Sequence, residues 1–172
     1  MAAIARACAS GELDAEIRVV VGNNAAAPAL AAAEAMGLNV QVVPLGDGYA
    51  ERLLEAFRGC DVICLAGYLR LLPVEVLQAF PNRVLNIHPS LLPKFGGKGM
   101  YGHHVHEAVI AAGETESGCS VHEVNEVYDD GRVILQFRCP VLPDDTPETL
   151  AARILPLEHA AFPAAIAQVL RG

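Results

Sequence analysis

Short apolar segments alternate with helical segments through the first half of the chain, and this alternation restricts the fold more than any other feature. Strands are predicted at 15–21, 40–43, 61–66 and 84–88, and helices at 1–10, 28–36, 49–59 and 73–80. The third strand holds the uninterrupted apolar run Val62-Ile63-Cys64-Leu65, which is typical of a parallel strand covered on both faces. The sequence therefore predicts an α/β fold with a doubly wound, mostly parallel, Rossmann-like sheet.

The pattern changes in the second half. Two strands, 118–124 and 132–139, are separated by a loop too short for a crossover helix, so we expect a C-terminal antiparallel hairpin. A long helix follows from Pro147 to Leu170, with Thr146 as its cap and with breaks expected at Pro156 and Pro163. A length of 172 residues fits a single domain, residues 1–172.

Composition excludes several classes of protein. Apolar residues make up 53% of the chain, but no run approaches the ~20 residues that a membrane span requires. A net charge of −8 argues against a nucleic-acid surface. No secretion signal is recognisable, and the five cysteines include no C-x-x-C pair. These features predict a soluble cytoplasmic protein with buried thiols.

The segment Asn86-Ile87-His88-Pro89 carries the main candidate for chemistry. Asn86 and His88 are two residues apart on a predicted strand and so share one face, and Pro89 ends the strand. An amide donor beside an imidazole suits a reaction in which charge develops on an oxygen while a proton moves. The alternative is that both residues only cap the loop that follows.

The run Asn86-Ile87-His88-Pro89-Ser90-Leu91-Leu92-Pro93 resembles the signature of the folate-dependent formyltransferase family. The run Leu65–Leu72, and Asp129-Asp130-Gly131 followed by Val133–Gln136, resemble the glycinamide ribonucleotide branch of that family. The resemblance implies transfer of a formyl group from 10-formyltetrahydrofolate to the amine of glycinamide ribonucleotide in de novo purine biosynthesis. It also implies a cis peptide bond between Leu92 and Pro93.

The resemblance implies three catalytic residues, Asn86, His88 and Asp129. Asn86 would donate to the oxyanion of a tetrahedral intermediate, and His88, as an imidazolium, would add a second donor and a proton for the leaving nitrogen. Asp129 would pair with His88 and raise its pKa. By itself, Asp129 in Asp129-Asp130-Gly131 fits an ordinary turn residue.

The resemblance implies binding residues as well. The folate pocket would be formed by two runs, Tyr68, Leu69, Arg70, Leu71, Leu72 and Asn125, Glu126, Val127, Tyr128. The ribonucleotide would contact Glu158, Pro89, Ser90 and His106. His106 and His122 are expected to pack near the substrate, and no metal is predicted because the histidines lack a ligand spacing.

Three departures from the family pattern stand out. The first strand of the family and its Gly-Ser-Asn-type phosphate loop have no match, which indicates either a truncated start or a variant without the loop. We expect a truncated start, because loss of a central strand would expose two sheet edges. Arg132 replaces the usual proline and would add a cation near Asp129, and the loop Lys94–Gly102 is long and rich in glycine.

Two other functions remain open. A 10-formyltetrahydrofolate hydrolase would share Asn86, His88 and Asp129, although its branch has His-His-Ser where this chain has His88-Pro89-Ser90. A truncated remnant that binds folate without turnover is the other alternative. The expected partners are the two small-molecule substrates, with no nucleic acid and no membrane, and a homodimer is left open.

Overall fold

Two β-sheets organise the chain in this computed structural model, which describes residues 1–172. The smaller sheet pairs β1 (Val20–Gly22) with β2 (Val40–Val42) in parallel. The larger has the order β3-β4-β5-β6 and consists of β3 (Ile63–Leu65), β4 (Val84–His88), β5 (Glu116–Glu123) and β6 (Val133–Pro140). The helices are α1 (Ala2–Ser10), α2 (Pro28–Ala35), α3 (Tyr49–Ala56), α4 (Val74–Ala79), α5 (His103–Ala111) and α6 (Pro147–Arg171).

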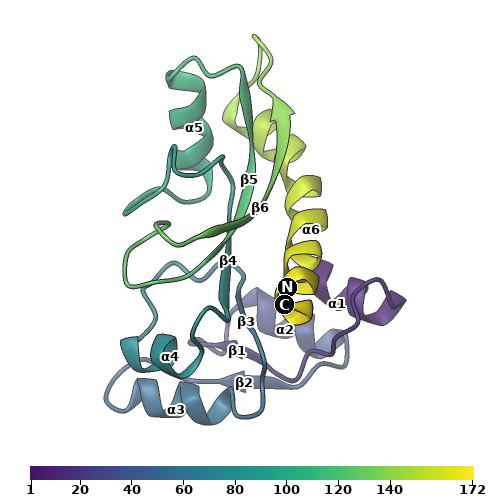
Figure 1. Cartoon of the computed structure of the whole chain (residues 1–172), viewed down its shortest axis with the longest axis vertical. Coiled ribbons are helices and arrows are strands. Elements are labelled where there is room, and N and C mark those ends of the chain that lie inside the picture. Colours follow the sequence, from purple (N-terminus) through teal and green to yellow (C-terminus); the bar gives the residue numbers. More distant parts are fainter.

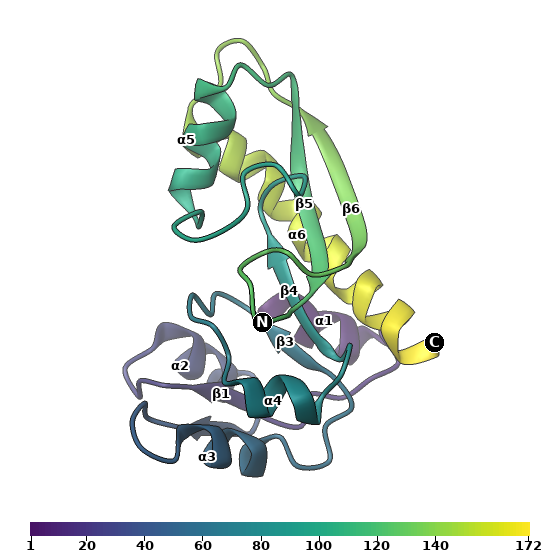
Figure 2. The same ribbon diagram turned by 60° about the vertical axis from the view of Figure 1, so that its left-hand side comes forward.

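Helix α6 covers one face of the larger sheet along most of its length (Figures 1 and 2). Its apolar residues pack against alternate residues of β4 and β5, because successive side chains of a strand point to opposite faces. The core on this face includes Leu85, Cys119, Val121, Leu150, Ile154 and Phe162. Asn86 and His88 alternate with these core positions and therefore face the other side of the sheet.

The predicted α/β class is confirmed, and so is the C-terminal hairpin, since β5 and β6 pair antiparallel. The sheet is interrupted, however, between β1 and β3. Each of these strands has a strand partner on one side only. Both line an apolar cavity of about 700 Å³, together with residues of α1 and α6 such as Ile4 and Ile166.

Several element boundaries differ from the prediction. Strand β1 begins at Val20 rather than residue 15, and sequence analysis did not predict α5. Helix α6 is continuous through Pro156 and Pro163. A proline removes one backbone donor, but burial of Ile154, Phe162 and Ile166 in the core holds the helix together on both sides of each ring.

The ends of two helices follow the expected capping rules. Thr146 caps α6, where its hydroxyl accepts from the amide of Thr149 and the Thr149 hydroxyl accepts in return from the amide of Thr146. Gly11 ends α1 with a φ of 77°, a left-handed conformation that glycine adopts without strain. These local signals therefore fix helix ends that the sequence predicted.

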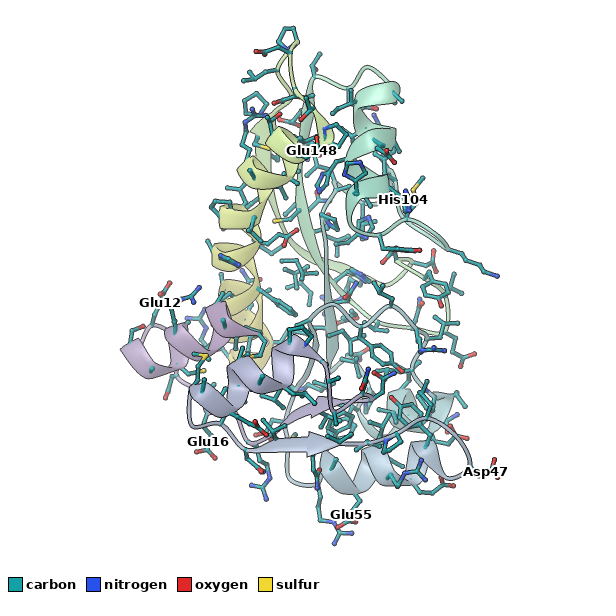
Figure 3. All side chains as sticks on the ribbon, turned by 180° about the vertical axis from the view of Figure 1, so that it is seen from behind. Glu12, Glu16, Asp47, Glu55, His104 and Glu148 are labelled. Carbon is teal, nitrogen blue, oxygen red and sulfur yellow. The ribbon has the colours of Figure 1, made fainter.

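Acidic side chains lie on the outside of the molecule. Glu12, Glu16, Asp47 and Glu55 are exposed and project from its periphery (Figure 3). The net charge of −8 is thus carried in part by groups in contact with water. None of the helices combines the length and the apolar character needed to cross a membrane.

The close pairing of β5 and β6 at Gly118 generates a testable prediction. A Cβ at this position would lie 1.9 Å from the carbonyl oxygen of Phe137, so Gly118→Ala must push the two strands apart. We expect it to lower the free energy of unfolding by about 1–3 kcal/mol or more, measured by urea denaturation. The adjacent Ser117→Ala is the control, because the buried Ser117 hydroxyl has no hydrogen-bond partner and its loss should be nearly neutral. Equal stability of the two variants would contradict this account.

Candidate active site

The end of β4 presents Asn86 and His88 on the same face of the larger sheet, as predicted. Their partners on β5 are His122, opposite Asn86, and Ser120, opposite His88. The flanking Leu85 is completely buried in the core. The apolar residues of β4 thus fix the strand, and the strand fixes where its two polar side chains point.

Asp129 joins the site from the loop between β5 and β6. One carboxylate oxygen lies 3.5 Å from Nδ1 of His88 and also accepts from the Gly97 amide at 2.9 Å. The other lies 3.4 Å from Nε2 of His122. Gly131 lets this loop close on β5, because a Cβ there would lie 1.8 Å from the carbonyl oxygen of Glu123.

The electrostatics of Asp129 favour its ionised form. Burial raises its pKa, but the contacts with His122, Gly97 and His88 together lower it, and the net pKa is below the ordinary value for an aspartate. A carboxylate among donors and imidazole rings keeps its negative charge. Asp129 is therefore a fixed negative charge between two histidines.

His88 is buried, with only 3% of its surface exposed. Its Nε2 lies 2.8 Å from the carbonyl oxygen of Phe95 and donates to it. Burial lowers the pKa of His88, and this outweighs the opposite effects of Asp129 and of the Phe95 carbonyl. The expectation that Asp129 keeps His88 as an imidazolium is therefore corrected, because desolvation of the charged ring is the larger effect.

His122 contacts both Asn86 and Asp129, although sequence analysis assigned it no more than a place near the substrate. Its Nε2 lies 3.1 Å from the amide nitrogen of Asn86, and its Nδ1 lies 2.7 Å from the carbonyl oxygen of Glu123. The ring is 2% exposed. The signal that could have found it is the strand register, which the sequence alone does not determine.

The turn after β4 is built around a buried hydroxyl network and the cis peptide bond Leu92–Pro93, which confirms the expected isomer. The Ser90 hydroxyl donates to the carbonyl of Lys94 at 2.7 Å. The Ser120 hydroxyl donates to the carbonyl of Ser90 at 2.6 Å. Ser90 is fully buried, so the structure gives it a role in shaping the turn, and its contact with a substrate stays a prediction.

The two runs expected to form the folate pocket lie on the same side of β4 (Figures 1 and 2). Tyr68 and Val124 pack against the same core cluster, of which Leu72 is a member. Leu69 and Val127 are more than half exposed, so their side chains are accessible to a ligand.

Two of the expected ribonucleotide contacts make no hydrogen bond or ion pair with Asn86 or Asp129. Glu158 is on α6, has no hydrogen bond or ion pair with the residues above, and has its pKa raised by burial. His106 on α5 is buried, and its Nδ1 has no hydrogen-bond partner. Burial, followed by the charges of His103 and His88, lowers the pKa of His106.

The surrounding charged residues differ from expectation in one respect. Arg132 donates to the carboxylate of Glu123 at 2.5 Å and not to Asp129, so it does not add a cation to the site as predicted. No group of three or more histidine, cysteine or carboxylate side chains is arranged to hold a metal ion. The site therefore consists of Asn86, His88, Asp129 and His122, with the loop from Phe95 to Gly97 against it.

These features define an α/β protein with a buried cluster of an amide, two imidazoles and a carboxylate at the end of a parallel strand. The chain belongs to the formyl transferase family, whose model matches residues 1–166. A chloroplastic phosphoribosylglycinamide formyltransferase from Arabidopsis thaliana is 44% identical over 163 residues, which cover 90% of this chain and 56% of that protein. The chain thus spans little more than half the length of this relative.

Other relatives agree with this assignment. The phosphoribosylglycinamide formyltransferase of Haemophilus influenzae is 36% identical, with 93% of this chain and 76% of that protein covered. The structure of the phosphoribosylglycinamide formyltransferase from Brucella melitensis superposes with a TM-score of 0.88 at 40% identity, over 99% of this chain and 88% of that one. A formyltetrahydrofolate deformylase from Pseudomonas syringae has a TM-score of 0.80 at 25% identity, with 99% of this chain and 55% of that one covered.

The lowered pKa values of His88 and His106 predict that stability falls in acid. Both rings bind fewer protons in the folded chain than in the unfolded chain. The free energy of unfolding should therefore decrease as the pH drops below about 6.5, the usual histidine pKa. Urea denaturation at pH 7 and pH 5 measures this, and His106→Gln should reduce the difference between the two. The same substitution at the exposed His159 controls for residue type, and an undiminished difference in His106→Gln would contradict the prediction.

Proposed function

We propose that this chain transfers a formyl group from 10-formyltetrahydrofolate to the amine of glycinamide ribonucleotide in purine biosynthesis. The observation that carries the proposal is a cluster of an amide donor, a buried imidazole and an ionised carboxylate. The carboxylate of Asp129 lies 3.5 Å from His88, and the side chains of Asp129 and Asn86 lie 3.4 Å and 3.1 Å from His122. Relatives support the proposal, since two proteins that are 44% and 36% identical to this chain are named phosphoribosylglycinamide formyltransferase.

In the proposed reaction, the substrate amine attacks the formyl carbon and a tetrahedral intermediate forms. The amide of Asn86 donates to the oxygen that becomes negative, which is the usual way to stabilise such an intermediate. The new carbon–nitrogen bond forms to the amine, and the bond to N10 of the folate breaks. The site must therefore move one proton from the amine to N10.

His88 and Asp129 are placed to move that proton. Since burial lowers the pKa of His88, the ring is a proton acceptor near neutral pH, and the adjacent carboxylate of Asp129 stabilises the imidazolium once it forms. His88 then returns the proton to the leaving nitrogen. For Nε2 to accept the proton of the amine, the ring must leave the Phe95 carbonyl and hold its own proton on Nδ1, beside the Asp129 carboxylate.

The folate and ribonucleotide sites are proposed from the family pattern. Leu69 and Val127, from the two exposed loops, would lie against the flat pterin, whose edges would bond to backbone groups of Tyr68–Leu72 and Asn125–Tyr128. Glu158 would accept from the ribose hydroxyls, with Pro89 and His106 near the nucleotide. The donor and acceptor are small molecules, and no metal takes part in the proposal.

The decisive experiment follows release of tetrahydrofolate from 10-formyltetrahydrofolate with and without glycinamide ribonucleotide. Release that depends on the ribonucleotide, with formation of its formylated product, supports the proposal. Release at the same rate without the ribonucleotide would instead identify a hydrolase, the activity named for the Pseudomonas syringae neighbour. Binding of folate without release would support a remnant without turnover.

The role of Asn86 leads to a quantitative prediction. Asn86→Ala should keep the fold and lower kcat by roughly a hundred- to a thousand-fold, the typical cost of losing one oxyanion donor. Asn39→Ala is a matched control, because the Asn39 amide bonds to the carbonyl of Arg18 and belongs to no part of the site. Steady-state kinetics with both substrates saturating would separate the two, and a loss below about tenfold in Asn86→Ala would remove Asn86 from the mechanism.

A further inference from the structure

His122 makes contacts that no other part of the proposed mechanism uses. It lies opposite Asn86 on β5, at the point where the pairing between β5 and β6 shifts. Val121 pairs with Leu135, but His122 pairs with Val133, so Ile134 is an extra residue on β6. A bulge of this kind re-aims nearby side chains and occurs often beside active sites.

The contacts of His122 determine which of its nitrogens carries the proton. Nδ1 lies 2.7 Å from the carbonyl oxygen of Glu123, and a carbonyl can only accept, so Nδ1 must be the donor. In the neutral ring, Nε2 is then an acceptor. Its neighbour at 3.1 Å, the side-chain amide of Asn86, must present its nitrogen to Nε2 rather than its oxygen.

This constraint leaves one hydrogen of the Asn86 amide available. The NH₂ group has two hydrogens, and the contact with Nε2 of His122 uses one of them. The amide nitrogen has no other hydrogen bond within the protein. The second hydrogen is therefore free to bond to an oxygen of a substrate.

We propose that His122 is the positioning residue that fixes the amide of Asn86 with its nitrogen toward the reacting oxygen. The proposal rests on the proposed formyl transfer and adds the requirement that Nε2 of His122 accept from Asn86. An Asn86 amide turned by half a rotation would present its carbonyl oxygen to the developing oxyanion and would repel it.

Protonation of His122 would remove this orientation. A proton on Nε2 would turn this atom into a donor, which can no longer accept from Asn86 and has the Asp129 carboxylate at 3.4 Å as an alternative partner. The other titratable groups near the ring are His88 on β4, whose pKa the charge of His122 lowers, and Glu123, whose carboxylate is paired with Arg132.

The kinetic test uses His122→Phe and His122→Gln, each made alone and combined with Asn86→Ala. His122→Phe should lower kcat by at least about tenfold. This is less than the cost of removing the oxyanion donor, because the Asn86 amide is still present but no longer held in one orientation. His122→Gln, whose side-chain oxygen is an acceptor, should retain more activity than His122→Phe. In the Asn86→Ala background, His122→Phe should cost less than about twofold, because the group that it positions is absent.

A full additional loss in the Asn86→Ala background would show that His122 acts independently of Asn86 and would overturn the proposal. Equal losses of kcat in His122→Phe and His122→Gln would overturn it as well, because only glutamine keeps an acceptor beside Asn86. Absence of formyl transfer in the unaltered chain would refute the proposed function instead, and the orientation of Asn86 would then be judged by a measurement that needs no turnover.

That measurement is the long-range ¹H–¹⁵N correlation spectrum of the ligand-free protein at pH 7, which reports the protonation of each imidazole nitrogen. We expect the proton of His122 on Nδ1 and none on Nε2, and we expect the side-chain amide protons of Asn86 to shift in His122→Gln. A proton on Nε2 would overturn the proposal whether or not the protein is active.

Discussion

The carboxylate of Asp129 is the interaction on which the site depends, because it contacts three separate segments of the chain. It lies within 3.5 Å of rings on β4 and β5 and accepts a hydrogen bond from the Gly97 amide in the loop after β4. Removal of this carboxylate would leave two buried histidines and one backbone amide without their common partner. Such loss of one member of a buried polar network costs more than the network contributes when intact. The loop from Phe95 to Gly97, the end of β4 and the hairpin are thus coupled through one charged group.

The same group divides the roles of the two histidines. His88 and His122 both lie beside Asp129 and both donate to a backbone carbonyl, of Phe95 and Glu123 respectively. Nε2 of His122 also lies beside the amide of Asn86, whereas Nδ1 of His88 contacts only the carboxylate. In the proposed reaction, His88 therefore carries the transferred proton, while His122 orients a neighbour.

The parts of this site that depend on local patterns could be predicted from the sequence. The spacing of Asn86 and His88 placed both on one face, and the family resemblance pointed to Asp129, which the structure brings to His88. The role of His122 depends on the register of β4 against β5 and on a bulge formed with β6, and both are long-range properties. The lowered pKa of His88 could not be predicted either. The balance between desolvation and the nearby carboxylate depends on how deeply the ring is buried, which the sequence does not determine.

Because strand pairing is interrupted between β1 and β3, the site lies on a different sheet from β1 and β2. Asn86, His88, Asp129 and His122 lie on β4, β5 and the loop that joins β5 to β6, where consecutive strands are hydrogen-bonded from β3 to β6. The cavity lies between β1 and β3 and is lined by none of these four residues. The geometry of the proposed acid–base chemistry is therefore set within one hydrogen-bonded sheet. Tyr68 and Leu72, which belong to the proposed folate site, also line the cavity, so an occupant of the cavity would affect folate binding more directly than it would affect the Asp129 contacts.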